Sequence, residues 1–149
     1  MALMIAAASS VLNRPRELVL EDMGTYLVSH ETLGTVRRLL RFSGLDFSDF
    51  LNSIEELPER RRLVLTDLEL PDLDLTDLGG GHFRLRCITG LDGAGHIMMG
   101  LLRAMADDYG ALVLLEHPGS DARGVVISIQ IADQALYEAR PFSLGITVR

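Results

Sequence analysis

The stretch that decides the fold is DLDLTDLGGGHFRLRCIT, residues 72–89. Its first part, 72–78, alternates leucine with aspartate and threonine, as a β-strand with one solvent-exposed face does. Three glycines at 79–81 mark a turn. The alternation resumes over 82–89, where Phe83, Leu85 and Cys87 share one face. The pattern predicts two antiparallel strands with a common apolar face.

The residues before this stretch predict helices. The first helix spans 1–12 and is broken at Pro15, and the second begins near Arg16. We expect Ser29 to be the N-cap of a third helix, which ends at Gly44. A fourth starts at Asp46 or Ser48. Its apolar residues have the spacing of a buried helical stripe; they are Phe47, Phe50, Leu51, Ile54 and Leu57.

The residues after it predict a helix over 93–109, then strands at 111–116 and 124–131 joined by a turn at 117–121. Helices followed by strand, strand, helix, strand, strand indicate an α+β fold. We expect an antiparallel β-β-α-β-β sheet subdomain covered on one face by the 93–109 helix. The whole chain, 1–149, is then one domain with a helical part (1–62) and a sheet part (63–149).

Composition limits the functional classes. With 149 residues and 48% hydrophobic residues, the chain suits a single domain with a real core. A formal net charge of -7 disfavours nucleic acid and anionic membranes as partners. The apolar N-terminus has no positively charged segment, so a signal peptide is not expected. A single cysteine fits a reducing compartment. We therefore expect a cytoplasmic protein without a membrane segment.

The candidate donor residues are few. His30 follows Ser29 in the expected first turn of a helix, and His96 shares a helical row with Gly100, Arg103 and Asp107 that we interpret as a solvated face. His82 and His117 fall in expected turns, and Cys87 is in phase with buried residues. No two histidines have the spacing of a dedicated metal site. No residue order suggests nucleophilic catalysis, and we expect no enzymatic activity.

Three stretches together resemble the H-NOX, or haem-NO-binding (HNOB), family. RRLLRF (37–42) running into DFLNSIEEL (49–57) is similar to the family's proximal helix. LELP (68–71) before the strand pair is similar to the proline-containing approach to its sheet. GLLR (100–103) through Leu115 and Glu116 is similar to its helix-then-strand signature. The resemblance covers roughly 18–131 in order and spacing.

The resemblance implies a haem-based sensor of nitric oxide or another gas. In the family, haem b lies between a helical and a sheet subdomain. A histidine ligates the iron, and a Tyr-x-Ser-x-Arg motif holds the propionates. The partner is a histidine kinase or a cyclic-dinucleotide enzyme. Here the position of the ligating histidine falls on Pro58, and the propionate motif falls on 86–92, where no register provides Tyr, Ser and Arg together.

Because proline has no donor atom for iron, a bound haem would need another ligand, and His96 and His30 are the candidates. The arginines at 60–62 and at 37, 38 and 41 could pair with propionates or an acidic partner. Two other functions remain open: a regulatory protein-interaction domain without haem, and a module that binds an apolar small ligand. We also expect that the family's first helices, which this chain lacks, leave an apolar surface, and that self-association into a homodimer covers it.

Overall fold

A computed structural model of the chain describes residues 2–42, 44–56, 59 and 71–132. Among these residues the helical part shows four helices and two short 3₁₀ turns: α1 (Ala2–Leu12), α2 (Arg16–Ser29), η1 (Glu31–Leu33), α3 (Gly34–Arg41), α4 (Phe47–Asn52) and η2 (Ile54–Glu56). The sheet part follows in the order β1 (Asp72–Gly79), β2 (His82–Ile88), α6 (Ala94–Tyr109), β3 (Val113–Asp121) and β4 (Gly124–Ile131).

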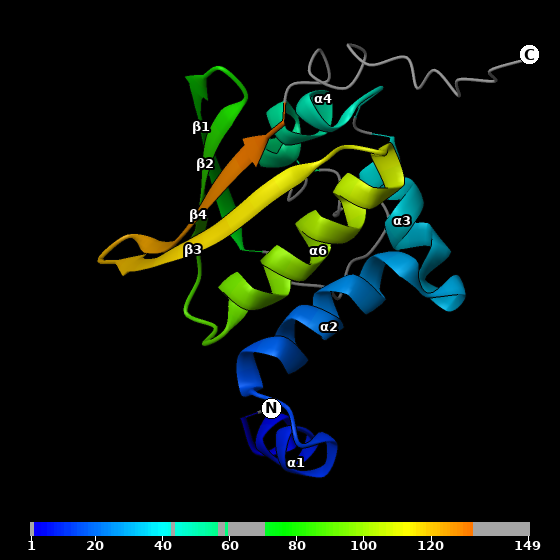
Figure 1. Cartoon of the computed structure of the whole chain (residues 1–149), viewed down its shortest axis with the longest axis vertical. Coiled ribbons are helices and arrows are strands. Elements are labelled where there is room, and N and C mark those ends of the chain that lie inside the picture. Colours follow the sequence, from blue (N-terminus) through cyan, green and yellow to red (C-terminus); the bar gives the residue numbers. More distant parts are fainter. Residues whose placement is uncertain (1, 43, 57–58, 60–70, 133–149) are drawn as a thin grey trace, which may run out of the picture.

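The four strands form one antiparallel sheet in the order β1-β2-β4-β3. Helix α6 crosses one face of this sheet, and α2 packs on the side of α6 that faces away from the strands (Figure 1). The α+β fold and the β-β-α-β-β order expected from the sequence are confirmed. None of the helices described is long and apolar enough to cross a membrane.

The apolar face of the sheet is the one expected from the alternation in 72–89. Leu75 pairs with Leu85 across β1 and β2, and Leu85 pairs with Ile127 across β2 and β4. Leu85, Cys87 and Ile127 are fully buried. The neighbouring residues Arg84 and Arg86 point to the opposite face, as the two-residue period of a strand requires.

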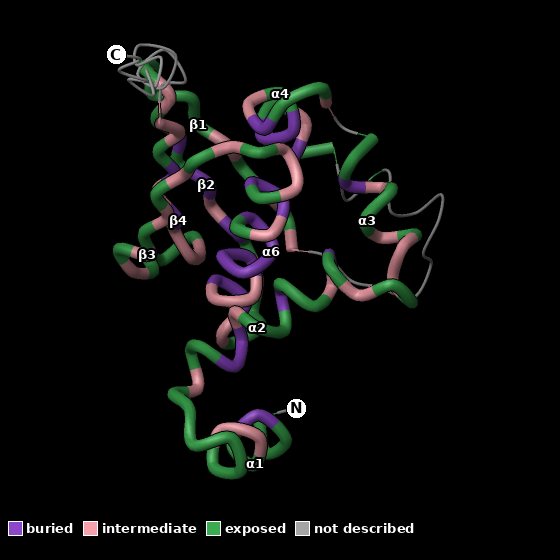
Figure 2. Tube along the Cα trace, turned by 45° about the vertical axis from the view of Figure 1, so that its right-hand side comes forward, coloured by how far each residue is buried: buried purple, intermediate pink, exposed green. Residues whose placement is uncertain are grey.

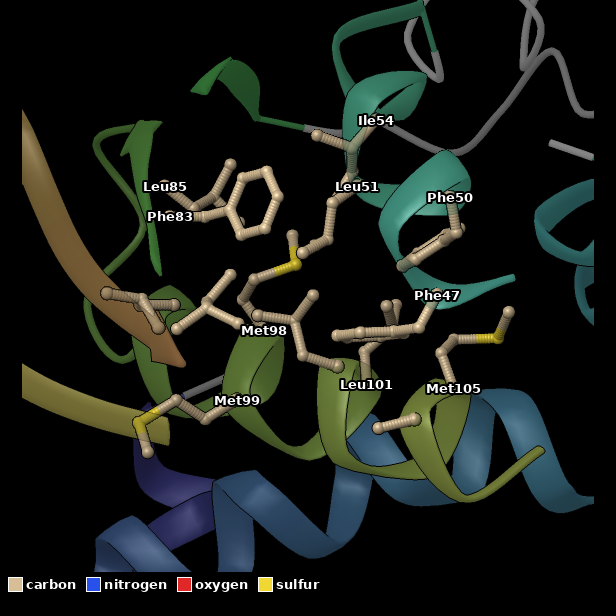
Figure 3. Packing of buried hydrophobic residues seen from close by; sticks show 14 of the residues in the cluster. Phe47, Phe50, Leu51, Ile54, Phe83, Leu85, Met98, Met99, Leu101 and Met105 are labelled. Carbon is tan, nitrogen blue, oxygen red and sulfur yellow. The ribbon is translucent and has the colours of Figure 1, made fainter. Parts of the chain in front are cut away.

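Helix α4 and η2 close the core from above α6. The side chains of Phe47, Phe50, Leu51 and Ile54 are at most 2% exposed. They extend toward the methionines and leucines of α6 and toward the sheet (Figure 3). Asp46 begins the helix, because its Oδ1 accepts a hydrogen bond of 2.8 Å from the backbone N–H of Asp49. The buried stripe is confirmed, apart from Leu57, which lies outside the described residues.

Helices α2 and α6 meet through glycine. A Cβ added to Gly24 would lie 1.9 Å from the carbonyl oxygen of Ile97, and one added to Gly100 would lie 1.9 Å from that of Glu21. The Thr25 hydroxyl donates to the Gly100 carbonyl at 3.3 Å. The two backbones are therefore in direct contact, and no side chain larger than hydrogen fits at either position.

The expected N-cap at Ser29 is wrong. Ser29 is the last residue of α2, and its hydroxyl donates to the Thr25 carbonyl at 2.8 Å. His30 caps η1 instead, because its Nδ1 accepts from the backbone N–H of Thr32 at 3.3 Å. An imidazole acceptor thus takes the role that the sequence suggested for a hydroxyl, and α3 begins only at Gly34.

The expected turn at 117–121 is also wrong, because β3 continues to Asp121. The β3–β4 register shifts between Glu116 and Gly119, so His117 and Pro118 form an irregularity inside the strand. Proline cannot donate a backbone hydrogen bond, but at a bulge the ladder does not require one. The reversal of the chain is confined to Ala122 and Arg123.

We predict that Leu51→Ala lowers the free energy of unfolding by about 2–5 kcal/mol, because it leaves a cavity at a fully buried site. Urea denaturation followed by circular dichroism measures the change. Phe42→Ala is the control, since Phe42 is 90% exposed and its loss should change stability little. Equal effects of the two substitutions would contradict this packing.

We predict that Gly100→Ala destabilises the protein by on the order of 1–3 kcal/mol, because the added methyl group forces α2 away from α6. Gly34→Ala is the matched control: Gly34 has open space around its Cα and begins α3 with helical backbone angles. It should be neutral or slightly stabilising. Thermal unfolding of both variants measures the difference, and an unaffected Gly100→Ala protein would rule out the backbone contact.

Candidate functional site

His96 and His117 lie side by side, although they come from α6 and β3. Their ring centroids are 5.0 Å apart with the planes tilted by 34°. The Nδ1 atom of His96 is buried without a hydrogen-bond partner and lies 3.9 Å from Oε1 of Glu21 on α2. Three elements thus bring two imidazoles and a carboxylate together at the start of α6. The sequence analysis did not predict this cluster.

The row that we interpreted as a solvated face of α6 is exposed at Arg103 and Asp107, but His96 and Gly100 lie where α6 meets α2. Glu21 is only 16% exposed and binds Arg103 at 2.6 Å through its second carboxylate oxygen. His96 is 25% exposed, and Gly100 is buried between the two. The physical reason is the glycine, because it lets α2 approach this row closely. Glycines inside two helical segments, at 24 and 100, were the signal that could have predicted the contact.

His117 is held in one tautomer. Its Nδ1 accepts a hydrogen bond of 3.1 Å from the backbone N–H of Gly119, so the neutral ring carries its proton on Nε2. A Cβ on Gly95 would lie 2.9 Å from that Nε2, so the ring edge fits against a glycine. A metal ion on Nε2 would require the other tautomer and the loss of the Gly119 bond.

Within the described ranges, no three His, Cys, Asp or Glu residues are placed to hold a metal ion.

The other two histidines lie elsewhere. His30 is at the carboxyl end of α2, where its Nδ1 also lies 2.7 Å from the Thr32 hydroxyl and its ring packs on Tyr26 at a centroid distance of 4.3 Å. His82 is exposed at the β1–β2 turn. His30 and His96, the two candidate haem ligands, therefore do not converge on a common site.

Cys87 is also unsuited to bind iron or another metal in the folded protein. It is fully buried in the sheet, and burial raises the pKa of its thiol from 9.0 to about 12. Since the thiolate is the form that binds metals, the protonated side chain acts as a small core residue at neutral pH.

Three arginines that could meet propionates, Arg37, Arg41 and Arg86, bind carboxylates of this chain, whereas Arg38 donates to the Gly34 carbonyl at 3.3 Å. Arg86, in the segment similar to the propionate motif, binds Asp121 at 3.0 Å and approaches Asp74 at 3.8 Å. The pKa of Asp121 is lowered mainly by the backbone N–H of Arg123, and Arg86 adds to this. Its carboxylate therefore stays ionised as the partner of Arg86.

Arg37 and Arg41 both bind Asp108 near the end of α6, Arg41 at 3.1 Å. The Arg41 guanidinium also lies 4.4 Å from the centre of the Tyr109 ring. The pKa of Tyr109 is raised, first by burial of its hydroxyl, so the ring stays neutral beneath the cation. This cluster joins α3 to α6 and leaves neither arginine unpaired. The arginines at 60–62 and Pro58 lie outside the described residues.

Four hollows on the described surface show where a ligand could enter. One of about 480 Å³ lies between α4, the β1–β2 turn and the end of β4, with Phe47, Tyr109, Leu112 and Ile131 in its wall. The others lie at the α2–α6 seam, beyond the end of β2, and beside α4. None of these four is lined by a histidine or by Cys87. None of these four hollows therefore offers an imidazole or a thiolate to a haem iron.

Within the described ranges, helices stacked on one face of a four-stranded antiparallel sheet define an α+β domain. The chain belongs to the haem-NO-binding family, whose sequence profile matches residues 1–117. This family is known for haem-based gas sensors. Among curated proteins, none matches the sequence significantly.

Solved H-NOX structures have the same fold. An H-NOX protein from S. oneidensis in the Fe(II)NO ligation state superposes with a TM-score of 0.74 at 16% identity, covering 87% of this chain and 72% of the other. The I5F mutant of T. tengcongensis H-NOX gives 0.68 at 12% identity, covering 87% and 70%. The family assignment and the fold expected from the sequence are thus confirmed.

We predict that Cys87 does not react with Ellman's reagent in the native protein at pH 8 and reacts at once in denaturant. Burial raises the pKa of the Cys87 thiol from 9.0 to about 12 in the folded protein. The neutral thiol therefore contributes fully to the free energy of unfolding below pH 9, and this contribution is lost as the pH rises toward 12. Ala122→Cys is the control, since residue 122 is exposed in the β3–β4 turn and should react in the native state. Rapid native reaction of Cys87 would contradict its burial.

Proposed function

We propose that this chain is a regulatory domain of the haem-NO-binding type that acts without stably bound haem, because the family's proximal histidine position falls on Pro58. In this proposal it is a single domain that signals by contact with a partner such as a histidine kinase or a cyclic-dinucleotide enzyme. The observation that carries the proposal is the filled core beside α4, the helix that resembles the family's proximal helix.

The space next to this helix is occupied by the chain's own side chains. Phe50, Leu51 and Ile54 are fully buried against Leu102 and Met105 of α6 and against the sheet. Protein interiors are close-packed, and a planar cofactor could enter this layer only by displacing several of these side chains. The position of the ligating histidine is a proline, which has no lone pair to offer iron.

The remaining donors support the same proposal. Each of the four histidines lies at a helix end, a turn or a seam, and Cys87 is a protonated core residue. Arg86, in the segment similar to the propionate motif, and Arg37 and Arg41 of α3 bind carboxylates of this chain. A haem group would have to compete with these pairs for its propionate contacts.

One observation favours a second candidate function, a gas sensor with haem on a non-standard ligand. The Nδ1 atom of His96 is buried and has no hydrogen-bond partner, and imidazole is the most common axial ligand of haem. For this function, α2 would have to separate from α6 to admit the macrocycle.

An absorption titration with haemin tests the proposal. We expect wild type to give no stoichiometric Soret complex, while Pro58→His gains affinity if the family's pocket can still open. His96→Ala and His30→Ala test the alternative ligands, and His82→Ala is the control for adventitious binding to an exposed imidazole. If the domain acts without haem, its effect on a partner kinase is also the same with and without nitric oxide.

A tight, stoichiometric complex in wild type would overturn the proposal. If that complex is lost in His96→Ala and kept in His82→Ala, the second candidate function is correct. If the Pro58→His substitution changes nothing while wild type already binds, the assignment of position 58 to the ligating histidine is wrong.

A further inference from the structure

Helix α1 exposes an apolar surface that the rest of the chain does not cover. Leu3 is 86% exposed, Met4 73%, Val11 85% and Leu12 57%, and within α1 only Ile5 is buried. The helix lies against the start of α2, away from the sheet (Figure 1), and most of its trace is exposed (Figure 2). Contiguous apolar surface of this kind marks an interaction site.

The charge distribution limits the partner. Residues 1–13 contain no Asp, Glu, Lys, Arg or His, in a chain with 14 basic and 21 acidic residues. Helices that lie on membranes carry Lys or Arg on their polar face, and α1 has none. A second copy of this acidic chain is repelled by most of its surface but not by this uncharged helix.

The order of residues along α1 suits a copy of itself. Leu3, Ala7 and Val11 follow each other at intervals of four and therefore share one face, and all three are exposed. The small residue lies midway between the two large ones. If two such helices pair antiparallel about a two-fold axis at Ala7, Leu3 of each lies opposite Val11 of the other. Alanine at the crossing point allows the helices to approach closely.

We propose that α1 is the interface of a homodimer, with two α1 helices antiparallel and Ala7 at the two-fold axis. The interface is isologous, because each copy contributes the same face. Burial of Leu3 and Val11, with Met4 beside them, removes on the order of 300 Å² of apolar surface per copy. Two copies together therefore bury less than the roughly 1,000 Å² of a stable specific interface, which places this one in the weak, transient class.

An interface of this size predicts a weak dimer. We expect sedimentation velocity to show a monomer–dimer equilibrium with a dissociation constant in the range of roughly 1–100 µM. A protein that stays monomeric throughout this range overturns the proposal.

A cysteine at the axis tests the geometry. Ala7→Cys places two thiols next to each other in the dimer, and oxidation should link most of the protein into a covalent dimer. The native cysteine does not interfere because it is buried. Ala122→Cys is the matched control, with a thiol that is exposed but distant in sequence and structure from α1. Equal cross-linking of both variants overturns the proposal.

A charge at the axis gives an independent readout. Ala7→Glu brings two carboxylates together and should weaken the dimer at least tenfold, whereas Ala122→Glu adds the same charge in the β3–β4 turn and should leave it unchanged. Circular dichroism shows whether α1 stays helical in both variants. If α1 unfolds in Ala7→Glu, the cross-linking of Ala7→Cys decides whether α1 forms the interface. If the two charge variants form equally stable dimers and Ala7→Cys is not cross-linked, the dimer uses another surface. The proposal is then wrong.

Discussion

The direct contact between the backbones of α2 and α6 is the constraint on which the rest of the described structure depends. Gly24 and Gly100 face each other's helices, and a methyl group at either one would overlap a carbonyl oxygen. Because α6 also covers the sheet, this contact fixes the helical part relative to the strands. Glu21 lies in the seam with Arg103 and His96 around it, so the same approach that joins the helices creates the cluster of titratable groups.

The second layer of packing follows from this placement. With α2 on one side of α6, its other sides are free to receive α4 and the sheet. Phe47, Phe50 and Leu51 occupy that space almost without solvent exposure. A core filled in this way explains why the chain can have the fold of the haem-NO-binding family without an imidazole at position 58. The fold depends on apolar packing around α6, and the ligand chemistry is a separate property of a few positions.

Electrostatic pairs add specificity along α6. Glu21 lies beside His96 near the start of α6 and binds Arg103 in its middle, while Asp108 at its end binds Arg37 and Arg41. Most of these groups are partly exposed, so each pair contributes little to the free energy of unfolding. Their role is to orient α2 and α3 on α6. They also engage the basic side chains that a propionate or another anionic group would otherwise meet.

The local elements were largely predictable from the sequence because periodicity reports which face of a segment is buried. The alternation in 72–89, the stripe at Phe47, Phe50 and Leu51, and the helix over 93–109 all have the structure that their spacing predicts. Two local details were wrong, the Ser29 cap and the turn at 117–121. In both cases His30 or His117 accepts a backbone hydrogen bond, and composition does not predict such a bond.

The sequence by itself determined the elements, the apolar face of the sheet, the family, and the absence of an imidazole at position 58. Only the tertiary structure decided which partner each face meets. Helical spacing placed His96, Gly100 and Arg103 on one face but could not show that α2 covers it, and it could not show that His117 of β3 lies beside His96. The physical reason is that periodicity describes one segment at a time. Contacts between segments distant in sequence depend on how closely two backbones can approach. Between α2 and α6, Gly24 and Gly100 set that distance.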